Sequence, residues 1–125
     1  MQVISSKEAP AALGPYSQAI RANGFVFLSG QIALDPTTGE MVKGSIADQT
    51  RQILLNLKNV LKSAGSDVSK VVKTTVFLTD MKDFEEMNAV YSQYFAQDKP
   101  ARSTIAVAAL PKGANIEIEA IALAE

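Results

Sequence analysis

The sequence predicts an α+β fold, in which a mixed sheet of about six strands carries two helices packed on one face. Three observations support this. Apolar and polar residues alternate in several short segments, apolar residues recur at helical spacing in two longer segments, and the order of segments is β-β-β-α-β-α-β-β. Residues 1–125 are enough for one domain around a single core.

Three strands are expected before the first helix. Val3–Ser6 is a short edge strand, and a loop marked by two X-Pro pairs follows it. Gln18–Ala22 and Phe25–Ser29 flank Asn23-Gly24, the strongest two-residue signal for a β-hairpin. Gly30 directly follows the second of these strands, where a glycine lets a ligand or another backbone approach closely.

Two helices follow from apolar residues at helical spacing. Ser45 and Asp48 resemble a capping box at the start of the first helix, and Gly65 is a natural stop. Asp83 and Glu86 are expected to cap the second helix.

Asn88 lies within the apolar stripe of that second helix. A polar amide in such a stripe is usually tied to a backbone group, but it can also reach into a pocket. Both interpretations stay open at this point.

The last strands are expected at Val71–Leu78, Arg102–Ala108 and Ile116–Leu123. In the first of them, alternation places four residues on one face, namely Val72, Thr74, Val76 and Leu78. Two helices can cover only one face of such a sheet, yet the late strands are apolar or small on both faces. Self-association is the simplest way to bury the other face.

Charged residues interrupt the last two strands. Arg102 shares a strand face with Thr104, and Glu117 shares one with Glu119. If the two strands are adjacent, a guanidinium and a carboxylate meet, which would make an anion-binding site with a base beside it. A structural salt bridge is the equally weighted alternative.

A second carboxylate close to Glu117 would disturb such a site unless its charge were neutralised. Glu119 lies about 7 Å along the strand from Glu117. Lys73, the one charged residue within Val71–Leu78, is the expected partner of Glu119.

Composition excludes several kinds of chemistry. The chain has no cysteine and no histidine, which excludes disulfides, thiol nucleophiles, Cys/His zinc sites and histidine-based triads. A net charge of −1 without a basic cluster gives no general attraction to nucleic acid or to an anionic membrane. No apolar run is long enough to span a bilayer, and the N-terminus lacks the pattern of a signal peptide. We expect a cytoplasmic protein, or a mitochondrial one if a presequence has been removed.

Six motifs, in this order, resemble those of the RidA (YjgF) family of reactive-intermediate imine deaminases over essentially the whole chain. They are Gly14-Pro15-Tyr16-Ser17-Gln18-Ala19, Leu28-Ser29-Gly30-Gln31, Val71–Leu78, Asp83-Phe84 with Asn88, Pro100-Ala101-Arg102-Ser103, and Leu110-Pro111-Lys112 followed by Ile116–Ala120. The resemblance implies a homotrimer of chorismate-mutase-like α+β domains, with sites in clefts between subunits.

The resemblance also implies roles for individual residues. The arginine that matches Arg102 binds the substrate carboxylate, and the glutamate that matches Glu117 positions the attacking water. Thr104 stands where many members carry Cys, and that position is thought to act through its backbone carbonyl. The other matching pocket residues are Tyr16, Ser29, Gly30 and Asn88.

By this resemblance the substrate is a reactive 2-imino acid, such as 2-iminobutanoate or the 2-iminopropanoate that arises from 2-aminoacrylate. Its hydrolysis gives a 2-keto acid and ammonia, with no metal and no organic cofactor. Two alternatives stay open. One is an endoribonuclease or translation inhibitor, which the absence of histidine and of a basic patch disfavours. The other is a non-catalytic trimer that binds small carboxylates or acts as a holdase.

Overall fold

A single six-stranded sheet organises the computed structural model of the protein, which describes residues 1–124. The strands lie in the order β1-β2-β3-β6-β4-β5, and all neighbours are antiparallel except the parallel pair β4 and β5. Their bounds are β1 (Gln2–Ile4), β2 (Ala19–Ala22), β3 (Phe25–Gln31), β4 (Val71–Leu78), β5 (Ala101–Ala106) and β6 (Ile116–Leu123). The predicted mixed α+β sheet is confirmed.

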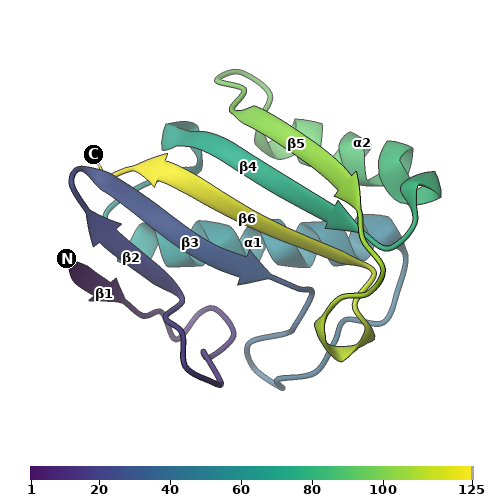
Figure 1. Ribbon diagram of the computed structural model, residues 1–125, viewed down its shortest axis with the longest axis horizontal. Coiled ribbons are helices and arrows are strands. Elements are labelled where there is room, and N and C mark those ends of the chain that lie inside the picture. Colours follow the sequence, from purple (N-terminus) through teal and green to yellow (C-terminus); the bar gives the residue numbers. More distant parts are fainter. Residues whose placement is uncertain (125) are drawn as a thin grey trace.

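Two helices, α1 (Ile46–Ser63) and α2 (Phe84–Tyr94), lie side by side on one face of this sheet, behind it in Figure 1. The core fills the space between the helices and the sheet, with Ile53 and Val60 of α1 and Val76 and Ile118 of the sheet fully buried. The prediction that both helices cover one face is therefore correct. Within residues 1–124, neither helix is long and apolar enough to cross a membrane.

The start of α1 has the predicted capping box. The Ser45 hydroxyl accepts a hydrogen bond from the Asp48 backbone N–H at 3.1 Å, and the Asp48 carboxylate accepts one from the Ser45 N–H at 3.4 Å. Both local signals, the cap residue and the acidic residue three positions later, could be read from the sequence alone.

The predicted position of the α2 cap is correct, but the predicted capping by the Asp83 and Glu86 side chains is wrong. Asp83 occupies the N-cap position but makes no capping hydrogen bond with its side chain. The Glu86 carboxylate instead accepts a hydrogen bond from the Ala47 backbone N–H at 2.9 Å, in the first turn of the other helix. A carboxylate is favourable there because the free N–H groups of a helix start carry partial positive charge. Glu86 thus connects the two helices.

Alternation fails at one position in β4. The pairing of β4 with β6 shifts register between Val71 and Lys73, so Val72 has no partner on β6, and it is 39% exposed instead of buried. The remaining three residues of the predicted set, Thr74, Val76 and Leu78, are buried as expected. A bulge of this kind inserts one unpaired residue into a strand, which simple alternation cannot reveal.

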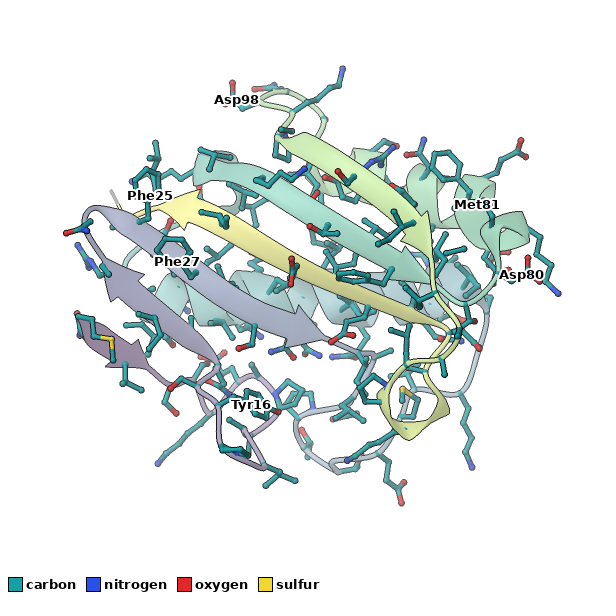
Figure 2. All side chains as sticks on the ribbon, in the orientation of Figure 1. Tyr16, Phe25, Phe27, Asp80, Met81 and Asp98 are labelled. Atoms are coloured by element: carbon teal, nitrogen blue, oxygen red, sulfur yellow. The ribbon has the colours of Figure 1, made fainter. Side chains whose placement is uncertain are left out.

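The sheet face opposite the helices is uncovered within residues 1–124 and carries exposed apolar residues beside polar ones such as Lys73 and Glu119. Figure 2 shows Phe25 and Phe27 on this face, where their side chains are 39% and 45% exposed. Ile105 of β5 and Leu123 of β6 are exposed to a similar degree. This observation agrees with the expectation that the face is buried by self-association, which itself stays a prediction.

Candidate active site

A cavity of about 560 Å³ opens where β3 and β6 meet the loop that precedes β2. It brings together four of the seven predicted site residues: Tyr16, Ser29, Gly30 and Glu117. Glu119 and Lys112 add charge to the lining, and the remaining wall is mostly apolar, with Pro10, Ala11, Leu13, Ile32, Leu34 and Pro111. The cavity is therefore a largely apolar chamber with a few polar groups, as is usual for small-molecule sites.

The direction of the Glu117 side chain follows from the pleat of β6. Its neighbours Ile116 and Ile118 are fully buried against the helices, so Glu117 must point to the opposite face. There it lies against the backbone of Gly30. A Cβ atom on Gly30 would overlap the Glu117 carboxylate and lie 2.8 Å from its Cδ. Gly30 is therefore explained by close approach of a side chain, because its φ lies outside the left-handed region.

The electrostatic surroundings of Glu117 favour its protonated form. Burial raises the pKa of Glu117, and the nearby negative charge of Glu119 raises it further. No cation of residues 1–124 lies within 4.0 Å of the Glu117 carboxylate. A half-buried carboxylate with a raised pKa and no ion-pair partner is a better proton acceptor than an ordinary surface glutamate.

The loop that carries Tyr16 is held by a buried amide, which sequence reasoning missed. The Gln18 side chain donates to the carbonyls of Pro10 at 2.7 Å and Ser6 at 3.1 Å, and it accepts from the Ser6 N–H at 2.6 Å. Because Ser6 is engaged by Gln18, it does not extend the first strand, which ends at Ile4 instead of Ser6. The sequence signal for this anchor was Gln18 itself, a polar side chain at the first position of the predicted strand, just after the Gly14-Pro15 loop.

A second anchor fixes the same loop to the cavity floor. The Ser29 hydroxyl donates to the Ser17 carbonyl at 2.6 Å, and the Ser29 N–H donates to the Gln18 carbonyl at 3.0 Å. Tyr16 follows Gly14 in a tight turn closed by a 2.9 Å hydrogen bond from its N–H. Tyr16 is 53% exposed and lines the cavity. Figure 2 shows its labelled side chain on the loop that precedes β2.

Arg102 lies in a different place from this cavity. It pairs with Thr74 across β4 and β5, and Thr74 is fully buried, so Arg102 projects toward the helices. Its Nη1 donates to Asn88 Oδ1 on α2 at 2.7 Å. Both earlier interpretations of Asn88 therefore fail within residues 1–124. Its amide oxygen accepts a hydrogen bond from the Arg102 guanidinium instead of bonding to a backbone group, and Asn88 does not line the cavity.

Thr104 belongs to the same group as Arg102. It pairs with the buried Val76 and therefore shares the helix-facing side of β5. Its hydroxyl oxygen is buried and has no hydrogen-bond partner within residues 1–124.

The expected meeting of Arg102 and Glu117 within one chain is wrong. β4 lies between β5 and β6, and the two side chains point to opposite faces of the sheet. The alternative of an internal salt bridge between them fails for the same reason. The sequence order of strands gives no sign that β4 is inserted between the last two.

The expected ion pair between Lys73 and Glu119 is also absent from residues 1–124. The Lys73 ammonium donates to the Ser103 hydroxyl at 3.0 Å, and no carboxylate lies within 4.0 Å of it. Because β5 lies beside β4, Ser103 is available to Lys73 on the open face.

The described residues also contain no group of three or more acidic side chains that could hold a metal ion.

Comparison with known proteins gives consistent similarities. The family model described as Endoribonuclease L-PSP matches residues 6–124. A RutC family protein of Pyrococcus horikoshii is 55% identical over 99% of this chain and 98% of its own length. The 2-iminobutanoate/2-iminopropanoate deaminase of Homo sapiens is 50% identical over 98% of this chain and 89% of its own length. The crystal structure of E. coli TdcF with bound serine superposes with a TM-score of 0.94 at 43% identity, covering 98% of each chain.

The raised pKa of Glu117 predicts a pH-dependent cost to stability. The ionised carboxylate is disfavoured in the folded state, so folding stability is lost as pH rises from the ordinary glutamate range through the raised pKa. We expect Glu117→Gln to have a higher Tm than the wild type at pH 7, and the difference to vanish near pH 4. Glu40→Gln, which removes an exposed carboxylate outside the cavity, is the control for net charge. A Tm for Glu117→Gln at or below that of the wild type at pH 7 would contradict the prediction.

The contact between Gly30 and Glu117 predicts what a methyl group would do there. Gly30→Ala should push the Glu117 side chain toward solvent, because its far end is flexible while the backbone of β3 is not. We expect the pKa of Glu117 to fall toward its ordinary value, measured by NMR titration, with a stability loss of about 1–3 kcal/mol. An unchanged Glu117 pKa in a folded Gly30→Ala protein would show that Gly30 does not set the carboxylate position.

Proposed function

The chain belongs to the endoribonuclease L-PSP (YjgF/RidA) family, and we propose that it is a hydrolase that converts reactive 2-imino acids to 2-keto acids and ammonia. The observation that carries this proposal is Glu117, a half-buried carboxylate with a raised pKa and no cation partner in a small-molecule cavity. Such a group is suited to take a proton from water. Relatives named as imine deaminases at about 50% identity support the same reaction class.

Arg102 is the proposed carboxylate-binding residue. A guanidinium presents a planar fork of donors that matches a carboxylate, and no carboxylate of residues 1–124 lies within 4.0 Å of it. The serine bound to the E. coli relative is a small carboxylate ligand, which supports a carboxylate site in this family.

A complete site requires two copies of the chain. One copy supplies the Tyr16, Ser29, Gly30 and Glu117 half of the site, and another supplies Arg102, Asn88 and Thr104. We propose that the copies associate as a homotrimer, with one site in each of its clefts. The uncovered apolar face with Phe25, Phe27, Ile105 and Leu123 supports association, because a patch of this kind is normally buried in an interface.

The chemistry in such a site needs little beyond orientation and a base. The imine carbon is electrophilic when its nitrogen is protonated. As the water oxygen bonds to this carbon, Glu117 takes a proton from the water and the C=N electron pair moves to nitrogen. Glu117 returns the proton to the nitrogen. The hydroxyl oxygen then forms the C=O bond as the C–N bond breaks, and Glu117 takes the hydroxyl proton and passes it to the departing ammonia, so that the 2-keto acid and an ammonium ion are released. The Thr104 carbonyl is the proposed second acceptor that orients the water.

The proposed roles predict different kinetic defects. Glu117→Gln keeps the size of the side chain but not its basicity, so kcat should fall by about 10²-fold or more while a 2-keto acid still binds. Arg102→Lys keeps the charge but loses the fork, so it should weaken binding of that acid. Ammonia release from an enzymatically generated imine measures turnover.

The control for the Glu117 variant is Glu119→Gln, which alters the other carboxylate of the same cavity and should lower kcat far less. Near-wild-type turnover of Glu117→Gln would refute the base assignment. A carboxylate-binding protein without catalysis would then be the better description.

A site shared between copies predicts complementation. Arg102→Ala and Glu117→Gln homo-oligomers should each be nearly inactive. After the two are unfolded, mixed in equal amounts and refolded, about a quarter of the shared sites should combine an intact Arg102 with an intact Glu117. Activity should recover to about that fraction. No recovery in mixed oligomers, verified by two different affinity tags, would exclude a site made by two copies.

A further inference from the structure

Three residues of α2 surround the Arg102 guanidinium. Phe84, Asn88 and Tyr91 are spaced at i, i+4 and i+7, so they share one helix face. The Arg102 Cζ lies 4.6 Å from the centroid of the Tyr91 ring and 5.5 Å from that of Phe84. Both distances are within the range of cation–π attraction. The Asn88 amide oxygen adds the hydrogen bond at 2.7 Å already described.

The Tyr91 ring is itself fixed to the sheet. Its hydroxyl makes a 2.6 Å hydrogen bond with the Thr74 hydroxyl, and both residues are buried, with 6% and 0% of their surface exposed. Thr74 is also the strand partner of Arg102. Arg102, Thr74 and Tyr91 therefore contact one another in turn. The strand pairing places Arg102 beside Thr74, the Thr74 hydroxyl is hydrogen-bonded to that of Tyr91, and the Tyr91 ring faces the Arg102 guanidinium.

Stability alone does not explain the hydroxyl pair. A Phe and a Val of the same shape would pack similarly, and replacing both partners of a buried hydrogen bond by apolar groups is often nearly neutral. What the hydrogen bond adds is a defined position for the ring. Burial raises the pKa of Tyr91, so the phenol keeps its proton and the hydrogen bond persists across the neutral range.

We infer that Tyr91, fixed by Thr74 and assisted by Phe84, is a positioning residue that holds the Arg102 guanidinium in the orientation that receives the substrate carboxylate. This inference rests on the proposed role of Arg102 in carboxylate binding. An arginine has several rotatable bonds, and ordering them on binding costs free energy. A guanidinium already held between two rings and an amide loses less freedom when the ligand arrives.

The test compares two leucine substitutions, one at Tyr91 within α2 and one at Phe95, which directly follows that helix. Tyr91→Leu removes the ring that faces Arg102. Phe95→Leu removes a buried ring that packs on Tyr91 at 4.6 Å but does not face Arg102, so it is the matched control for lost packing. The readouts are the Kd of 2-oxobutanoate by calorimetry, KM and kcat for imine hydrolysis, and the free energy of unfolding.

We expect Tyr91→Leu to raise the Kd and KM by about 10-fold, with a smaller change in kcat, because the defect lies in carboxylate binding. Phe95→Leu should lower stability and leave Kd within about 2-fold of wild type. Tyr91→Phe keeps the ring without the hydroxyl, so its Kd should lie between those of the wild type and Tyr91→Leu. If Tyr91→Leu does not fold, Phe84→Leu, at a partly exposed position, should still raise the Kd by about 3-fold.

A double variant distinguishes failure of this inference from failure of the proposed function. Tyr91→Leu combined with Arg102→Ala should bind no more weakly than Arg102→Ala alone, because Tyr91 acts through Arg102. If Arg102→Ala itself leaves the Kd unchanged, the proposed carboxylate site is wrong. If Arg102→Ala weakens binding while Tyr91→Leu and Phe84→Leu match the Phe95→Leu control, the site stands and the positioning role is overturned.

Discussion

β4 lies between the strand that carries Arg102 and the strand that carries Glu117, and the proposed site depends on this separation. On adjacent strands and on the same face, the Arg102 guanidinium and the Glu117 carboxylate could form an ion pair that occupies both groups. Because β4 and the thickness of the sheet separate them, both charged groups stay available to bind a ligand. The guanidinium is held by neutral groups, Asn88 and two aromatic rings, and the carboxylate is left with a raised pKa.

The two halves of the proposed site are held in place by different physical means. Around Glu117 the contacts are made mainly with the backbone. Gly30 leaves space for the carboxylate, and the side chains of Gln18 and Ser29 hold the loop that carries Tyr16 by hydrogen bonds to main-chain carbonyls. Around Arg102 the support is side chains on one helix face. The first half thus depends on small and amide residues near the hairpin, and the second depends on how α2 packs against β4 and β5.

The sequence predicted features whose causes are local. Asn23-Gly24 forms the expected hairpin turn with positive φ at both residues, and Ser45 with Asp48 forms the expected capping box. Four predicted residues meet in one cavity because Tyr16, Ser29 and Gly30 lie on or beside the hairpin. Features with distant causes were missed. The order of β4, β5 and β6 and the pairing of Lys73 with Ser103 depend on which strands become neighbours, and the contact of Glu86 with the first turn of α1 depends on how the two helices pack.

The position of β5 in the sheet also connects the association of copies with the proposed site. Within residues 1–124, β5 has one strand neighbour, so Arg102 lies on an edge strand that another copy can approach, and Ile105 of the same strand is exposed on the opposite face. Exposed apolar surface favours association, and association at this edge is what would bring a second chain's Glu117 toward Arg102. In the proposed assembly, one chain carries the Arg102 group and the Glu117 group at separate places, and a complete site forms only between two copies. In this interpretation the burial of apolar surface between copies supplies the free energy that assembles the site, and the two unpaired charges gain a common ligand only once that interface exists.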